Sequence, residues 1–257
     1  MSDSPQPYRV LARKYRPRSF SELIGQDAMV QTLGNAIRRG RLAHAFLMTG
    51  VRGVGKTSTA RLIAKALNCV GPDGQGGPTI DPCGICEPCR AIAEGRHIDV
   101  VEMDAASHTG VDDVREIIEA VRYAAVSARY KIYIIDEVHM LSTAAFNALL
   151  KTLEEPPERV VFVFATTEVQ EVPETILSRC QRFNFRRIAT GTIADHLRTI
   201  VSAEKIEADD EALFLLARRA DGALRDAESL LDQVVSFNAE RLTTETVGDV
   251  LGLVDGG

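Results

Sequence analysis

Residues 50–57 read Gly50-Val51-Arg52-Gly53-Val54-Gly55-Lys56-Thr57 and match G-x-x-x-x-G-K-[ST], the pattern of a phosphate-binding P-loop. The glycines let the backbone curl so that successive N–H groups point at an anion. Residues 45–49 predict a short buried strand before the loop, and residues 57–67 predict a helix after it. A glycine-rich turn without a ligand is the alternative. Strand, loop and helix nevertheless follow one another in the order that phosphate binding requires.

The residue types of the P-loop predict how it would hold the phosphates of a nucleotide. Lys56 can reach the β- and γ-phosphates, and the hydroxyl of Thr57 can ligate Mg²⁺. The helix that begins near Lys56 directs unpaired N–H groups and the positive end of its dipole at the same phosphates. The other expected phosphate-binding positions lie in the loop and the first helical turn: Gly50, Gly53, Val54, Gly55 and Ser58.

The bulk composition is that of a globular protein with a sizeable core. The chain has 257 residues, of which 45% are hydrophobic and 26% charged, and a net charge of −6. It has no apolar run of membrane-spanning length and no signal peptide, which predicts a soluble, cytoplasmic protein. Residues 1–7 are expected to form a polar, disordered tail. Residues 1–60 hold ten basic and three acidic side chains, which suits nucleotide or nucleic-acid binding or a solvated face equally well.

Apolar strand patterns alternate with helical patterns up to about residue 187. Such alternation predicts a parallel sheet covered on both faces, with ligands at the carboxyl ends of the strands. The expected strands are 45–49, 99–103, 130–136, 159–165 and 182–185, and the expected helices between them are 57–67, 111–125 and 142–154.

Beyond residue 187 only helical spacing remains. Helices are expected at 191–204, 209–220, 224–237 and 243–251, with Asp209 and Thr243 as N-caps. The predicted fold is therefore an α/β P-loop domain over 1–187, followed by a small all-helical lid over 188–257.

Two carboxylates end the third predicted strand. Asp136 and Glu137 follow the apolar run 130–135, as in a Walker B element. Asp136 can hold Mg²⁺ through water, and Glu137 can orient or deprotonate the attacking water. A protein that only binds nucleotide needs no such base, so the pair predicts hydrolysis.

Four cysteines suggest a structural zinc site. Cys69, Cys83, Cys86 and Cys89 are spaced so that their thiolates can converge on a tetrahedral Zn²⁺, and the module at 69–89 would form an insert in the P-loop domain. An Fe–S cluster is the alternative for the same ligands. Cys180 stands apart and is expected to be a buried thiol.

Other polar residues carry weaker signals. Arg179, in Ser178-Arg179-Cys180, is a candidate arginine finger or a surface charge. Thr166 and Thr167 could bind the γ-phosphate or the lytic water, or cap the end of the strand. Arg225 could reach a phosphate or pair with a neighbouring aspartate.

These elements together resemble the clamp-loader AAA+ ATPases, and among them the gamma/tau subunits of the bacterial DNA polymerase III clamp loader. The resemblance covers about residues 8–252. The motifs that carry it are Tyr15-Arg16-Pro17, Ile24-Gly25-Gln26, residues 50–57, Asp104-Ala105-Ala106-Ser107, Asp136-Glu137-Val138-His139, Leu153-Glu154-Glu155-Pro156-Pro157 and Ser178-Arg179-Cys180, together with the four cysteines.

The resemblance implies roles for several residues. Thr167 would be sensor 1, Arg225 would be sensor 2, and Arg179 would act on the ATP of the next subunit. The adenine side of the site would be lined by residues 24–26 and by the stretch that contains Ala12, Tyr15, Arg16 and Pro17.

The resemblance also implies partners: other clamp-loader subunits, a ring-shaped sliding clamp and primer–template DNA. Lys151 and Arg115 are candidate DNA contacts, or solvated charges. The chain is expected to be a fragment that lacks a collar domain, so a pentamer is expected only with that domain. As part of a polymerase holoenzyme, it would be grouped with transferases. The alternatives are a nucleotide-gated scaffold that does not hydrolyse ATP and a Holliday-junction AAA+ motor.

Overall fold

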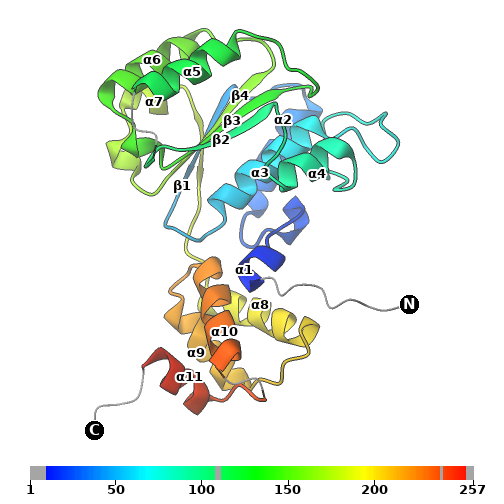
Figure 1. The fold of residues 1–257 in the computed structure, drawn as a ribbon, viewed down its shortest axis with the longest axis vertical. Helices are drawn as coiled ribbons and strands as arrows, with labels where there is room; N and C mark the ends of the chain where they lie inside the picture. The colour runs from blue at the N-terminus through cyan, green and yellow to red at the C-terminus, as the bar shows by residue number, and fades with distance from the viewer. Residues whose placement is uncertain (1–9, 108–110, 238–239, 253–257) are drawn as a thin grey trace. The chain divides into compact units, whose positions relative to one another are not determined.

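A parallel sheet with strand order β2-β3-β4-β1-β5 forms the centre of the larger of two compact units (Figure 1). The computed structural model describes residues 10–107, 111–237 and 240–252; the predicted tail at 1–7 lies outside these ranges. The larger unit contains residues 17–50 and 56–185, and the smaller contains 1–16, 51–55 and 186–257. The strands are β1 (Ala45–Thr49), β2 (Val100–Asp104), β3 (Lys131–Asp136), β4 (Val160–Thr166) and β5 (Gln181–Asn184).

All four strand pairings are parallel, as the alternating pattern predicts, and each predicted strand is found within one residue of its expected ends. Every residue of β1 and β4 is buried. Strands buried on both faces must be apolar throughout, which explains why these segments read as continuous hydrophobic runs. Strand β2, at one edge of the sheet, is more exposed: of its five residues only Val100 is buried.

Helices cover both faces of the sheet in the larger unit (Figure 1). On one face lie α5 (Val111–Val121), α6 (Thr143–Glu154) and α7 (Glu174–Leu177), and on the other lie α2 (Asp27–Arg38), α3 (Lys56–Asn68) and α4 (Glu87–Ala93). Short 3-10 helices occupy Phe20–Glu22, Val138–Met140 and Val169–Glu171. The core under α5 and α6 includes the stacked rings of Tyr133, Phe162 and Phe164, with centroids 5.5 and 5.8 Å apart.

Several helical segments differ from the expectations. No helix was predicted at Leu11–Lys14, α2, α4 or α7, and the predicted helix at 111–125 ends at Val121. The backbone N–H groups of residues 126–128, just beyond that end, bind the side chain of Asp99. A carboxylate distant in sequence thus accepts the N–H groups that a longer helix would have paired. The apolar pattern of residues 111–125 carries no signal for this contact.

The smaller unit is built from α1 (Leu11–Lys14), α8 (Thr190–Ala203), α9 (Asp210–Arg219), α10 (Leu224–Phe237) and α11 (Thr244–Leu251). Helix α8 buries Ile193, Leu197 and Ile200, and α9 buries Leu213, Leu216 and Ala217. Thr243 caps α11 by accepting the N–H of Thr246, as predicted. Asp209 stands at the N-cap position of α9, as predicted, and its carboxylate binds Arg241 at 2.6 Å instead of a helix N–H. In the described part of the chain no helix has both the length and the apolar character needed to cross a membrane.

Asp99 is a buried anchor at the start of β2. It is 2% exposed, and its carboxylate accepts the backbone N–H groups of Val126, Ser127 and Ala128 at 2.8 Å each. Burial disfavours the charged form, but these donors outweigh that effect and hold the pKa of Asp99 below its ordinary value. The carboxylate therefore fixes the loop that leads from α5 into β3.

We expect Asp99→Asn to lower the free energy of unfolding by about 1–3 kcal/mol at pH 7, because the N–H groups of Ser127 and Ala128 lose the oxygen that accepts them. The folded-state pKa of Asp99 is depressed, so its contribution is present above the unfolded pKa of about 4 and is lost as the pH falls through the folded value. Urea unfolding across the acid range measures this. The exposed Glu158→Gln is the control, and a deficit that does not shrink in acid would contradict the assignment.

Candidate functional site

The first glycine of the P-loop is required by a close backbone approach. Gly50 has φ +147°, and a Cβ placed there would lie 2.6 Å from the carbonyl oxygen of Phe185. The loop connects β1 to α3, whose first residue is Lys56. The Lys56 side chain is nearly buried, and its Nζ donates to the carbonyl of Gly50 at 2.7 Å. The ammonium group is thus held at the start of the loop. Ser58, in the first turn of α3, is half-buried.

The tip of the loop belongs to the smaller unit together with Arg225. The carbonyl of Gly53 accepts the backbone N–H of Arg225 at 3.3 Å, and Gly53 and Gly55 both have positive φ. Val54 is buried. The side chain of Arg225 is exposed, so its role as sensor 2 stays a prediction, while its backbone contacts the loop directly.

Two oxygen ligands for a metal meet where β3 ends and α3 begins. The hydroxyl of Thr57 lies 3.4 Å from Oδ2 of Asp136, although the residues are 79 positions apart. Hydroxyl and carboxylate oxygens are the ligands that Mg²⁺ prefers. The donor set fits the magnesium site that the sequence predicts.

Glu137 follows Asp136 with a left-handed backbone, φ 51° and ψ 44°. Its N–H donates to Oδ1 of Asp136 at 2.9 Å, and its Oε2 accepts the hydroxyl of Thr167 at 3.3 Å. The structure therefore brings the predicted base and the predicted sensor 1 together. The hydroxyl of Thr166 instead accepts the N–H of Glu168 at 3.0 Å, which is the strand-end cap considered for it.

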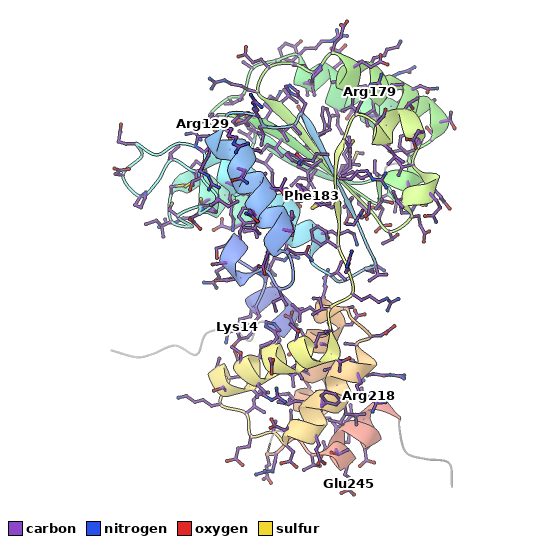
Figure 2. All side chains as sticks on the ribbon, turned by 180° about the vertical axis from the view of Figure 1, so that it is seen from behind. Lys14, Arg129, Arg179, Phe183, Arg218 and Glu245 are labelled. Atoms are coloured by element: carbon purple, nitrogen blue, oxygen red, sulfur yellow. The ribbon has the colours of Figure 1, made fainter. Side chains whose placement is uncertain are left out.

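Arg179 follows α7 and is exposed (Figure 2). Its guanidinium donates to Glu154 and to the carbonyl of Thr175, both at 2.9 Å. Neither partner belongs to the P-loop or to the end of β3. The role of Arg179 toward another subunit stays a prediction. Cys180 is partly buried against the core, and burial raises the pKa of its thiol to about 12.

The predicted adenine-side residues are divided between the two units. Ala12, Tyr15 and Arg16 are half-buried in the smaller unit, and Pro17 is half-buried in the larger. The hydroxyl of Tyr15 donates to Glu204 at 2.7 Å, and burial together with this carboxylate raises its pKa to about 12. Contact with adenine stays a prediction for this group.

The predicted DNA contacts lie on the surface of the larger unit. Lys151 is exposed on α6, opposite the buried face that contains Phe146 and Leu149. Arg115 is also exposed and pairs with Asp112 at 3.3 Å. Their role toward DNA stays a prediction.

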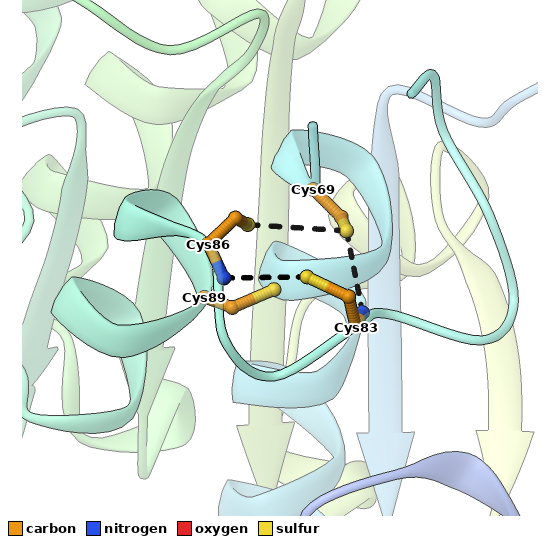
Figure 3. A group of neighbouring side chains, drawn as sticks. All are labelled: Cys69, Cys83, Cys86 and Cys89. Atoms are coloured by element: carbon orange, nitrogen blue, oxygen red, sulfur yellow. Dashed lines mark hydrogen bonds between the residues drawn. The ribbon is translucent and has the colours of Figure 1, made fainter. Parts of the chain in front are cut away.

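The four cysteines converge into one cluster at the end of α3 and the start of α4 (Figure 3). Their sulfur atoms all lie within 4.8 Å of one another, and Sγ of Cys86 and Cys69 are 4.0 Å apart. Four sulfurs about 2.3 Å from one zinc ion would lie about 3.8 Å apart, so a small contraction completes a tetrahedral site. The ligands taken from the sequence spacing are therefore the ones that the fold assembles.

The electrostatics of the cluster suit thiolate ligation. Sγ of Cys69 accepts the N–H groups of Gly71 and Cys83, and Sγ of Cys83 accepts that of Cys86. Burial raises the pKa of Cys69 and Cys89. For Cys83 burial acts in the same direction, but N–H donors outweigh it and lower the pKa to about 7. A cation would stabilise the charged form of all four groups.

Arg129 and Asn68 connect the segment around Cys69 to the residues that precede β3. No sequence pattern identified either residue. The Arg129 guanidinium donates to the carbonyls of Leu67, Cys69 and Gly76 at 2.8, 3.3 and 3.0 Å (Figure 2 labels Arg129). Asn68 and Tyr130 exchange side-chain-to-backbone hydrogen bonds at 2.8 and 3.1 Å. The partners are 53 to 62 residues apart, so only the folded chain reveals these contacts.

Comparison with known families covers most of the chain. Residues 25–189 match the family model described as DNA polymerase III, delta subunit. Residues 192–240 match the model of the DNA polymerase III clamp loader subunit, ATPase lid domain. The chain is also 46% identical over 247 residues to the DNA polymerase III subunit gamma of Buchnera aphidicola subsp. Acyrthosiphon pisum, covering 96% of this chain and 67% of that protein.

This chain belongs to the gamma/tau family of DNA polymerase III clamp-loader subunits. It is 50% identical to the DNA polymerase III subunit tau/gamma of Haemophilus influenzae and 49% identical to the subunit tau of Escherichia coli, each over 96% of this chain. It spans 35% and 38% of the length of these two relatives. The family inferred from the motifs is confirmed.

The fold is that of the AAA+ ATPases. The Thermotoga maritima structure titled RuvB Holliday junction branch migration motor superimposes with a TM-score of 0.67 at 21% identity, covering 93% of this chain and 73% of that chain. This likeness supports the predicted fold, an AAA+ sheet domain with a cysteine cluster and a C-terminal helical lid. The comparisons support the ATPase class and give no support to a transferase activity of the chain itself.

We expect the chain to bind about one equivalent of zinc through the cysteine cluster. Substitution of Co²⁺ should give the visible bands of a tetrahedral thiolate site, and Cys89→Ser should weaken them, because Cys89 is buried within the cluster. Metal analysis and absorption spectra measure this. Cys180→Ser, outside the cluster, is the matched control. Iron and sulfide in the purified chain would instead support the Fe–S alternative.

Proposed function

We propose that this chain is the ATP-driven motor subunit of a sliding-clamp loader, which binds and hydrolyses ATP to open the clamp and load it on primed DNA. The observation that carries the proposal is the convergence of Thr57, Asp136, Glu137 and Thr167 in a chain of the clamp-loader family. A site that only senses nucleotide has no use for a carboxylate base held beside a hydroxyl.

The proposed reaction is phosphoryl transfer from ATP to water. Mg²⁺, held by Thr57 and by Asp136, would neutralise phosphate charge when it is bound. Lys56 binds the β- and γ-phosphates, and Glu137 accepts a proton from the attacking water. Thr167 orients Glu137, and Arg225 contacts the phosphates from the lid. Arg179 would complete the site of a neighbouring subunit in a cytoplasmic multisubunit loader.

The domain roles follow from the same proposal. The AAA+ domain would end near residue 187 and contain the module at 69–89, whose closed thiolate shell would be structural rather than catalytic. Residues 188–257 would form the lid. Other loader subunits, the clamp and primer–template DNA are the proposed partners, and pentamer formation would need a collar domain.

Two alternatives are weaker. A scaffold subunit that binds nucleotide without hydrolysis would not need Lys56, Thr57 and the Asp136–Glu137 pair together. A Holliday-junction motor shares the fold, but at 21% identity that likeness shows the fold alone. Steady-state turnover with clamp and primed DNA, compared with turnover on four-way junctions, separates the candidates. Clamp-independent, junction-dependent turnover would remove the leading proposal.

We expect Glu137→Gln to keep ATP affinity and to lower turnover in the assembled loader by at least about 100-fold, because the amide cannot accept the proton of water. Binding of a fluorescent ATP analogue and phosphate release measure the two effects. Glu158→Gln, an exposed residue, controls for the loss of one negative charge. Unchanged turnover would exclude Glu137 as the base.

We expect Arg179→Ala and Lys56→Ala loaders to be inactive separately but to regain part of their turnover when the two chains are mixed in one assembly. At a mixed interface the intact Arg179 of one subunit faces the intact Lys56 of its neighbour. Arg122→Ala, an exposed residue paired with Glu119, is the control. If mixing restores nothing, Arg179 acts within its own chain or not at all.

A further inference from the structure

His139 lies between the ends of β3 and β4 and has no role in the proposed reaction so far. Its side chain is only 7% exposed. Nδ1 lies 2.8 Å from Oγ1 of Thr166, and Nε2 lies 3.4 Å from Oε2 of Glu137. One imidazole ring thus joins the strand-end cap of β4 to the carboxylate at the end of β3.

The hydrogen bonds around Thr166 indicate which ring nitrogen carries the proton. Oγ1 of Thr166 accepts the backbone N–H of Glu168 at 3.0 Å. Its own hydroxyl proton then needs an acceptor, and Nδ1 of His139 is at hydrogen-bond distance. In the neutral ring these contacts favour the tautomer with the proton on Nε2, the nitrogen that faces Glu137.

We propose that His139 is a positioning residue that holds the base Glu137 in its productive orientation through Nε2–H. This inference rests on the proposed function, in which Glu137 activates water. Oε2 of Glu137 faces Nε2 of His139 and accepts the hydroxyl of Thr167. Oε1 is therefore the oxygen directed to water. The Nε2–Oε2 distance is long for a hydrogen bond, and catalytic contacts commonly shorten once substrate is bound.

The backbone of Glu137 gives a reason for such a holder. Its left-handed conformation turns the side chain away from the direction that the strand would give it. A carboxylate on a flexible side chain loses catalytic efficiency when it is misplaced by about 1 Å. Two donors on one oxygen remove that freedom.

Two substitutions of His139 separate its contact with Glu137 from its contact with Thr166. The amide nitrogen of Gln occupies roughly the place of Nε2, and the amide of Asn roughly that of Nδ1. We expect His139→Asn to lower kcat by at least about tenfold with KM for ATP unchanged, and His139→Gln to retain most of the rate. In the Glu137→Gln background, His139→Asn should have no further effect, because the group it positions is already lost.

Turnover of the assembled loader with clamp and primed DNA measures these rates, together with nucleotide affinity. Equal losses in both variants, or a loss confined to KM, would overturn the positioning role while leaving the function of the chain intact. If the wild-type loader shows no turnover above Glu137→Gln, the proposed function fails and this inference fails with it.

A measurement on the chain alone tests the tautomer without any activity. Nitrogen-15 NMR of the histidine rings, with His139→Asn used for assignment, should show Nε2 protonated and Nδ1 unprotonated at a pH where the ring is neutral. The opposite tautomer would overturn the proposal whatever the kinetic result, because Nε2 could then donate nothing to Glu137.

Discussion

The site depends on one constraint: parallel strands present their carboxyl ends at the same edge of a sheet. Thr49 is paired in register with Thr166, and Asp104 with Asp136. The start of the P-loop, the hydroxyls at the end of β4 and the carboxylates at the end of β3 therefore lie at one edge, where Thr57 contacts Asp136 and Thr167 contacts Glu137. A slip of one residue in any pairing would turn every side chain of the slipped strand to the other face and separate the site.

The second constraint acts on α3, which has the P-loop at one end and the cysteine cluster at the other. Lys56 is its first residue, and Cys69 follows its last. Helices leave carbonyl groups unpaired at their C-termini, and Arg129 binds those of Leu67 and Cys69. Asn68 adds a link to the start of β3. The cluster thus stabilises the far end of the helix that begins at Lys56.

Sequence reasoning predicted what local chemistry determines. Strands β1, β3 and β4 were predictable because each is a largely continuous apolar run, and the cysteine cluster because its spacing reflects ligand geometry. Helices α1, α2, α4 and α7 were not predicted, and the carboxylate of the N-cap residue Asp209 binds Arg241, 32 residues away, instead of a helix N–H. Asp99, Arg129 and His139 act through partners fixed by the tertiary fold. A single sequence carries no periodic or spacing signal for such contacts.

Under the proposed function, the left-handed backbone of Glu137 lowers the stability of the fold at a position where the side chain is needed for activity. A non-glycine residue in that conformation costs about 1–2 kcal/mol relative to one that adopts it freely. Glycine at position 137 would relieve this cost and also remove the carboxylate. A laboratory selection for thermal tolerance alone would therefore drift toward glycine here, and under the proposed function a chain improved in that way would hold its nucleotide and fail to turn it over. Only a selection that requires turnover would keep a glutamate in this conformation.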